Sequence, residues 1–173
     1  MYSIEINALW GVKKIYCNTC CFFGHRELVE TDELRRWVRN IIENLIVNEG
    51  VDTFLFGSKS HFNYLCYELV SEAKKKHPHI KRIYVRAEYP VISDSYRLYL
   101  LKEYEDTFFP ESVKGANRSA YIKRNREMVD KSWFCVVYYD EADLPQVRKS
   151  GTKMALEYAR KKGKTIYQFS NEK

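Results

Sequence analysis

The stretch Trp133–Tyr139 (WFCVVYY) decides the fold class of this 173-residue chain. Its seven consecutive side chains are apolar or aromatic, so a strand formed here would be buried on both faces. Strands of this kind are typical of parallel sheets, in which helices cover both sides. We therefore expect residues 133–139 to form a central strand of a parallel sheet.

Helical and strand-like patterns alternate on both sides of this stretch. Apolar residues recur at helical spacing in four segments: 31–50, with Thr31 as N-cap and Gly50 at the end, 61–76, 117–131 and 151–162. Short apolar runs predict strands at 15–23, 53–56, 80–85 and 165–169, and residues 96–104 and 105–110 predict a short helix and a short strand. Strands separated by helices predict an α/β fold, with a doubly wound, mostly parallel sheet and helices on both faces.

The composition is that of a globular domain. Hydrophobic residues make up 45% and aromatic residues 15% of the chain, and 173 residues suit one domain. The net charge is +6, from 29 Lys and Arg against 23 Asp and Glu. Most basic clusters lie at expected helix ends, where they complement the helix dipole. A nucleic-acid surface is therefore not indicated, whereas attraction for a small anionic ligand fits the charge.

The chain shows no secretory signal pattern, and no apolar run approaches the roughly 20 residues that a membrane span needs. We expect a soluble, cytoplasmic protein without membrane contact.

The five cysteines are expected to be reduced thiols, mostly buried in strands. Cys17 and Cys20 have the spacing of zinc ligands, with His25 nearby, but the chain has no second pair of this kind. We therefore expect no metal, with a zinc site as the weaker alternative.

Three expected strands are followed by turns that contain glycine. These turns are Gly24-His25-Arg26, Gly57-Ser58-Lys59-Ser60 and, beyond a longer loop, Ser150-Gly151-Thr152. In a parallel sheet such turns lie at one edge, where backbone N–H groups, hydroxyls and helix N-termini bind anions. Each glycine alone is also typical of an ordinary turn, so the pattern predicts an anionic ligand and nothing finer.

Two further positions have open interpretations. Arg124 and Asn125 lie on the expected helix 117–131, and its first turns can lean over the same sheet edge. Asn125 then either anchors a neighbouring loop or contacts the ligand. His25 either donates to a phosphate or acts as an acid, or it forms a structural hydrogen bond to the backbone.

Several sequence blocks carry a resemblance to a known family. These blocks are FGHR (23–26), FGS (56–58), KRNREMVDKS (123–132), SGT (150–152) and EYARKKGK (157–164). In this order they resemble the SLOG superfamily, and within it the small bacterial YpsA-like branch. We interpret the chain as a single domain over 1–173, with an N-terminal extension at 1–13 and a variable insert at 87–112.

The resemblance implies a Rossmann-like three-layer fold that binds a nucleotide or a nucleotide-derived signal. Relatives include cytokinin-activating phosphoribohydrolases and ligand sensors of antiphage systems. The implied ligand-binding residues are Gly24, His25, Arg26, Gly57, Ser58, Arg124, Asn125, Ser150, Gly151 and Thr152. No separate cofactor is expected, and a homo-oligomer remains open.

One departure from the family bears on catalysis. The phosphoribohydrolases have a glutamate three residues after the motif threonine, where this chain has Ala155. Glu157 lies two residues further, about 200° around a helix. We therefore favour a binding protein over an enzyme. The first alternative is a nucleotide hydrolase that uses Glu68, Glu157 or Asp140, and the second is a stress or division factor that contacts protein partners through residues 89–109.

Overall fold

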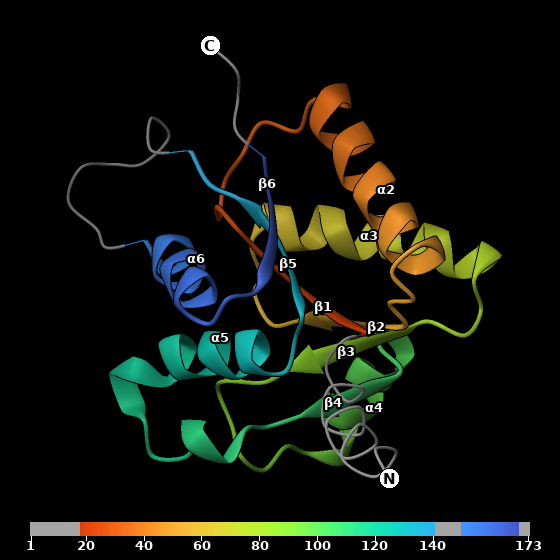
Figure 1. Cartoon of the computed structure of the whole chain (residues 1–173). Coiled ribbons are helices and arrows are strands. Elements are labelled where there is room, and N and C mark those ends of the chain that lie inside the picture. Colours follow the sequence, from red (N-terminus) through yellow and green to blue (C-terminus); the bar gives the residue numbers. More distant parts are fainter. Residues whose placement is uncertain (1–17, 141–149, 170–173) are drawn as a thin grey trace, which may run out of the picture.

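The computed structural model describes residues 18–140 and 150–169. This part of the chain contains six strands: β1 (Thr19–Gly24), β2 (Thr53–Phe56), β3 (Lys81–Val85), β4 (Asp106–Phe108), β5 (Phe134–Tyr138) and β6 (Thr165–Phe169). They form one sheet in the order β4-β3-β2-β1-β5-β6, and every neighbouring pair is parallel. The expected parallel sheet is therefore confirmed, and each of the six predicted strands overlaps an observed one (Figure 1). Residues 15–17 of the first predicted strand lie outside the described residues.

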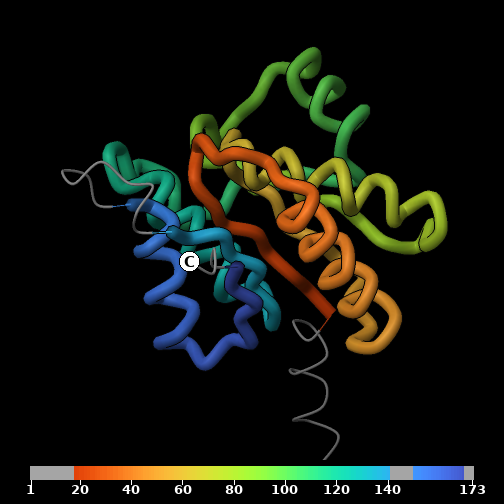
Figure 2. The backbone as a smooth tube through the Cα atoms, turned by 90° about the horizontal axis from the view of Figure 1, so that it is seen from above, coloured from red at the N-terminus to blue at the C-terminus, as the bar shows by residue number. Residues whose placement is uncertain are grey.

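Helices cover both faces of this sheet. The α-helices are α2 (Asp32–Val47), α3 (His61–Lys76), α4 (Asp94–Glu103), α5 (Ala120–Asp130) and α6 (Gly151–Lys161), and two 3₁₀ turns are η1 (Glu111–Val113) and η2 (Asn117–Ser119). Figure 2 shows α2 and α3 on the opposite side of the strands from α5 and α6. The protein thus has the Rossmann-like three-layer α/β fold that the sequence predicts.

The central strand β5 explains why the sequence pattern was so apolar. All five of its residues are buried. Val136 packs into the core layer under α2 and α3, whereas Cys135 and Val137 pack into the layer under α5 and α6. Because successive strand residues point to opposite faces, a strand between two helix layers needs apolar side chains at every position.

Hydroxyl side chains cap the N-termini of four described helices: Thr31 for α2, Ser60 for α3, Ser93 for α4 and Ser150 for α6. Thr31 accepts a hydrogen bond from the Leu34 amide at the start of α2, as predicted. Ser60 and Ser150 cap α3 and α6 in the same way. These caps satisfy amide groups that the first turn of a helix leaves without partners.

The segment 87–112 adds α4, β4 and the start of η1 to the fold, and β4 extends one edge of the sheet. The Arg82 guanidinium binds both carboxylate oxygens of Glu105, which holds this edge to β3. Apolar side chains of the same region are exposed at Tyr89, Val91, Leu98, Tyr99 and Leu101. Within the described ranges, none of the helices has the length and apolar character needed to cross a membrane.

Cys20, Cys21, Cys66 and Cys135 are buried and carry free thiols, as expected for strand and core cysteines. Cys21 and Cys135 are paired neighbours on β1 and β5, with 3.5 Å between their Sγ atoms. The hydrogen bond with Cys21 and burial raise the pKa of the Cys135 thiol. Cys17, which the zinc alternative requires, lies outside the described residues, and the described part holds no cluster of three or more metal-binding side chains.

Candidate functional site

One cavity of about 840 Å³ lies at the carboxyl ends of the strands. All ten ligand-binding residues that the sequence predicts line it: Gly24, His25, Arg26, Gly57, Ser58, Arg124, Asn125, Ser150, Gly151 and Thr152. The cavity is within the usual size range of small-molecule sites, about 300–1,000 Å³. The folded chain therefore brings together turns that are up to 128 residues apart, from Gly24 to Thr152.

The cavity lies where the strand order changes direction. From β1 the chain proceeds to β2, β3 and β4 on one side, and to β5 and β6 on the other. Two crossovers that leave in opposite directions open a crevice between the ends of β1 and β5. Open α/β sheets bind ligands at such switch points.

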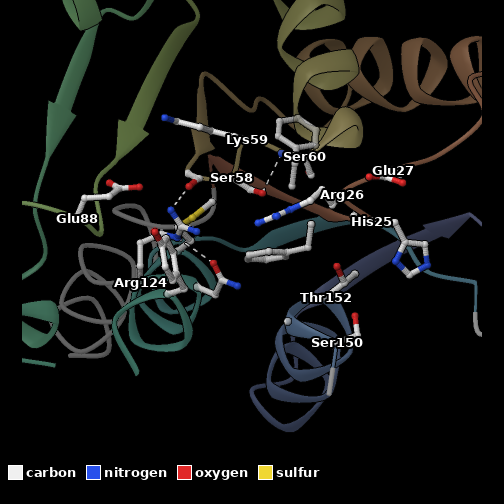
Figure 3. Close-up of a pocket in the computed structure, with 18 residues that line it drawn as sticks. His25, Arg26, Glu27, Ser58, Lys59, Ser60, Glu88, Arg124, Ser150 and Thr152 are labelled. Carbon is white, nitrogen blue, oxygen red and sulfur yellow. Dashed lines mark hydrogen bonds between the residues drawn. The ribbon is translucent and has the colours of Figure 1, made fainter. Parts of the chain in front are cut away.

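The N-termini of two helices lie at this crevice. The first turn of α3 begins at Ser60, whose amide donates to the Ser58 Oγ at 3.1 Å. The first turn of α6 begins at Ser150, whose Oγ accepts from the Lys153 amide. Figure 3 shows Ser58 and Ser60 on one side of the cavity and Ser150 and Thr152 on the other. The positive ends of both helices favour a bound anion.

Two of the predicted glycines make room for neighbouring side chains. A Cβ atom on Gly24 would lie 2.3 Å from Phe62 Cγ, and one on Gly57 would lie 2.8 Å from the Arg124 Cδ. Neither glycine has a positive φ. The sequence explains these two glycines by the close approach of a ligand and does not reveal their packing role. Gly151 differs from both, because a Cβ at this position would meet nothing within 4 Å.

Arg124 is the most unusual residue of the cavity, because its side chain is a buried cation. Its exposed fraction is 3%. Its Nη1 donates to the Gly57 carbonyl oxygen and lies 3.4 Å from the Val85 carbonyl oxygen. Among the described residues, no carboxylate forms an ion pair with it and its Nη2 has no hydrogen-bond partner. Burial lowers the pKa of the guanidinium, whereas the nearby charge of Glu88 has the opposite, smaller effect.

Neighbouring side chains on α5 fix the direction of this guanidinium. Asn125 accepts a hydrogen bond from the Arg124 Nε at 2.9 Å, and the Tyr121 ring lies 5.6 Å from the Arg124 Cζ. Asn125 is half-buried and also lines the cavity, so both sequence interpretations of it, as an anchor and as a ligand contact, fit its position.

His25 is buried and interacts with the backbone at the end of β5. The Asp140 amide donates to the His25 Nε2 at 2.9 Å, and the Asp140 carbonyl oxygen lies 3.0 Å from the same atom. In Figure 3 the imidazole lies at the border of the cavity, beyond Thr152. The geometry therefore favours the structural alternative for His25 over a role as phosphate donor or acid.

The structure adds residues that sequence reasoning did not select. Glu88 follows β3, and Tyr121 lies in the first turn of α5; both line the cavity. No glycine directly follows β3, so the pattern of glycine turns does not include Glu88. Its position after a strand of a parallel sheet was the available signal.

The acids proposed for a hydrolase do not gather at the cavity. Glu68 forms an ion pair with Arg35 at 3.4 Å, and Glu157 is exposed on α6. Asp140 contacts His25 through its backbone. None of the three is among the described residues that line the cavity. Ala155 is buried in the apolar layer under α5 and α6. Among the described lining residues the carboxylates are Glu27 and Glu88, against the three cations Arg26, Lys59 and Arg124.

Comparison of the chain with models of known protein families finds no match, and comparison with curated proteins finds none either.

Proposed function

We propose that the protein binds a nucleotide or a nucleotide-derived signalling ligand in the cavity at the strand ends, as expected from its resemblance to the SLOG superfamily. The observation that carries the proposal is Arg124, a buried cation without a described carboxylate partner, at the same cavity as the N-termini of α3 and α6. A phosphate group would provide the missing negative charge.

The energetic reasoning starts from the cost of burying a charge. An ion moved from water into a protein interior loses several kcal/mol, unless hydrogen bonds or an opposite charge compensate. The carbonyl oxygens of Gly57 and Val85 compensate for part of this loss. A ligand phosphate would add a charge-assisted hydrogen bond, and a guanidinium already held in place loses little conformational entropy when it binds.

Binding without catalysis is the form of the proposal that the site favours. The position of the motif glutamate is occupied by Ala155, whose side chain faces the apolar core and not the cavity. A hydrolase built on Glu68, Glu157 or Asp140 would need that acid at the cavity, and none of the three is among its described lining residues. A catalytic role would fall to Glu27 or Glu88 instead.

Isothermal titration calorimetry with nucleoside phosphates, dinucleotides and ADP-ribose-type ligands tests the proposal. We expect at least one of these ligands to bind the wild-type protein, and Arg124→Met to weaken that binding at least 10-fold. The matched control is Arg126→Met, which removes the same charge on the same helix at an exposed position outside the cavity.

Circular dichroism and an Arg124→Lys variant separate loss of the site from loss of the fold. We expect Arg124→Lys to retain part of the affinity, because the positive charge remains. Failure of every ligand class to bind the folded wild-type protein would overturn the proposal.

A further inference from the structure

We propose that Tyr121 and Glu88 form a base-binding subsite, and that the preferred ligand is a guanine nucleotide. This inference rests on the proposed function. It names the base, which is the part of the ligand that the N-termini of α3 and α6 do not recognise. Tyr121 would stack on the base, and the Glu88 carboxylate would accept hydrogen bonds from its edge.

The sheet sets the distance between the two ends of the cavity. Neighbouring strands lie about 4.8 Å apart, so the end of β3 is about 10 Å from the end of β1. Ser150 and Thr152 lie at the switch-point end, and Glu88 follows β3 at the other end, with Arg124 between them in Figure 3. A ligand whose phosphate lies at the helix N-termini would thus place an extended remainder, such as a nucleoside, toward Glu88.

Tyr121 has the exposure and the support that a stacking platform requires. Its exposed fraction is 56%, although it lines the cavity. The Arg124 guanidinium, itself held by the Gly57 carbonyl oxygen, lies 5.6 Å from the centre of its ring. This contact favours one ring position on the first turn of α5, and the exposed part of the ring remains available to a planar base.

Glu88 lies close to the same cluster. Burial raises the pKa of the Tyr84 hydroxyl, and the charge of Glu88 and the hydroxyl of Tyr121 raise it further. The charge of Arg124 lowers the same pKa, so all three side chains act on Tyr84. One oxygen of the Glu88 carboxylate, Oε2, accepts from the Ala87 amide at 3.1 Å. Glu88 is exposed, and within the described residues its Oε1 has no hydrogen-bond partner and its carboxylate forms no close ion pair. Burial lowers the pKa of Arg124 and Arg86, and the charge of Glu88 has the opposite, smaller effect on both.

The chemistry of a carboxylate selects among the bases. An ionised carboxylate accepts hydrogen bonds and donates none. Guanine presents two adjacent donors, N1–H and N2–H₂, on one edge, whereas adenine presents one amino group beside an acceptor nitrogen. Glu88 therefore matches guanine better than adenine.

The experiment compares GMP, AMP and ribose 5-phosphate by titration calorimetry on wild-type protein and on variants. We expect wild-type protein to bind GMP more tightly than AMP. Tyr121→Ala should weaken GMP binding about 5- to 150-fold, the range that loss of base stacking gives. Tyr121→Phe should retain the affinity, and Glu88→Gln should weaken GMP binding about 10-fold and reduce the preference for GMP over AMP.

Control variants remove similar side chains elsewhere. Tyr99→Ala and Glu111→Gln change exposed residues outside the cavity, and we expect both to bind GMP like the wild-type protein. Ribose 5-phosphate has no base, so its affinity should be the same in Tyr121→Ala, Glu88→Gln and wild-type protein.

The outcomes separate this inference from the proposed function. If wild-type protein binds nucleotides but Tyr121→Ala or Glu88→Gln binds GMP unchanged, the base subsite is wrong and the proposed function stands. Equal losses for ribose 5-phosphate in Glu88→Gln would place Glu88 on the sugar and overturn the assignment to the base. If no nucleotide binds the wild-type protein, the proposed function itself fails.

Discussion

Gly57→Ala tests the link between the sheet edge and the buried arginine. The new Cβ would lie 2.8 Å from the Arg124 Cδ and the Met128 Sδ, and 2.9 Å from the Arg124 Nη1. Ordinary contacts of this kind lie at 3.4–4 Å, so the two side chains must move by about 0.6 Å or more. Because Gly57 has no positive φ, the backbone itself tolerates alanine and the effect reports on packing.

The expected change in stability follows from three contributions. Overpacking in a dense interior costs about 1–3 kcal/mol. Displacement of Arg124 weakens its hydrogen bond to the Gly57 carbonyl oxygen, and a charged hydrogen bond contributes about 1.5–3 kcal/mol. The smaller conformational freedom of the unfolded alanine chain offsets about 0.4–1 kcal/mol. Because the hydrogen bond is weakened and not lost, its contribution roughly cancels the offset from the unfolded chain, and we expect a net loss of about 1–3 kcal/mol in the free energy of unfolding.

Urea denaturation followed by circular dichroism measures this loss, and for a chain of this size it lowers the Tm by about 2–12 °C. The matched control is Gly151→Ala, where the new Cβ meets nothing within 4 Å and alanine favours the first turn of α6. We expect Gly151→Ala to be as stable as the wild-type protein or more stable. A Gly57→Ala protein that is as stable as Gly151→Ala would refute the reasoning about Arg124 packing.

Three further outcomes follow from the structure. Gly24→Ala should destabilise the fold more than Gly57→Ala, because its Cβ would lie 2.3 Å from Phe62 Cγ. In urea denaturation, the stability lost in the double variant Gly24→Ala/Phe62→Ala should differ from the sum of the losses in the two single variants. Burial raises the pKa of Tyr84 from 10.0 to about 12, so the folded protein holds this proton more tightly than the unfolded chain. The free energy of unfolding should therefore fall as the pH rises from about 10 to about 12. Urea midpoints measured over this pH range should fall less in Tyr84→Phe than in the wild-type protein. Ser60→Ala and Thr31→Ala each remove a helix cap and should each cost about 1 kcal/mol of stability, but only Ser60→Ala should weaken nucleotide binding in calorimetry, because only Ser60 lines the cavity.

The layered fold was predictable because its signals are local. The apolar run of β5 indicates burial on both faces, and the spacing of apolar residues marks the helices on either side of it. The turns after β1, β2 and β5 could be placed at one edge once the sheet was taken as parallel. These inferences need only the period of the pattern and the rule that parallel strands end together.

The inner structure of the site was less predictable because it depends on contacts between distant residues. A single arginine in an amphipathic helix is typical of a solvent-exposed position, and nothing near Arg124 in the sequence indicates burial. Its burial requires the space left by Gly57, 67 residues earlier. The same holds for Gly24, whose missing side chain is explained only by Phe62 on α3.

Glu88 and Tyr121 escaped prediction for a related reason. Each is a common residue type in an unremarkable local pattern, and each gains significance only from its distance to Arg124 and to the helix N-termini. Conversely, His25 was selected for its chemistry, and its interaction with the Asp140 backbone became visible only when β1 and β5 were paired.

The most direct test of the central claim is a ¹H–¹⁵N NMR titration of the wild-type protein with GMP. If a phosphate is bound at the carboxyl ends of the strands, the amide resonances of residues 60–63 in α3 and 150–153 in α6 should shift in a saturable way. Resonances of the first turn of α2, which does not line the cavity, should stay unchanged. Saturable shifts confined to other parts of the molecule, or no shifts with any nucleotide, would contradict the account.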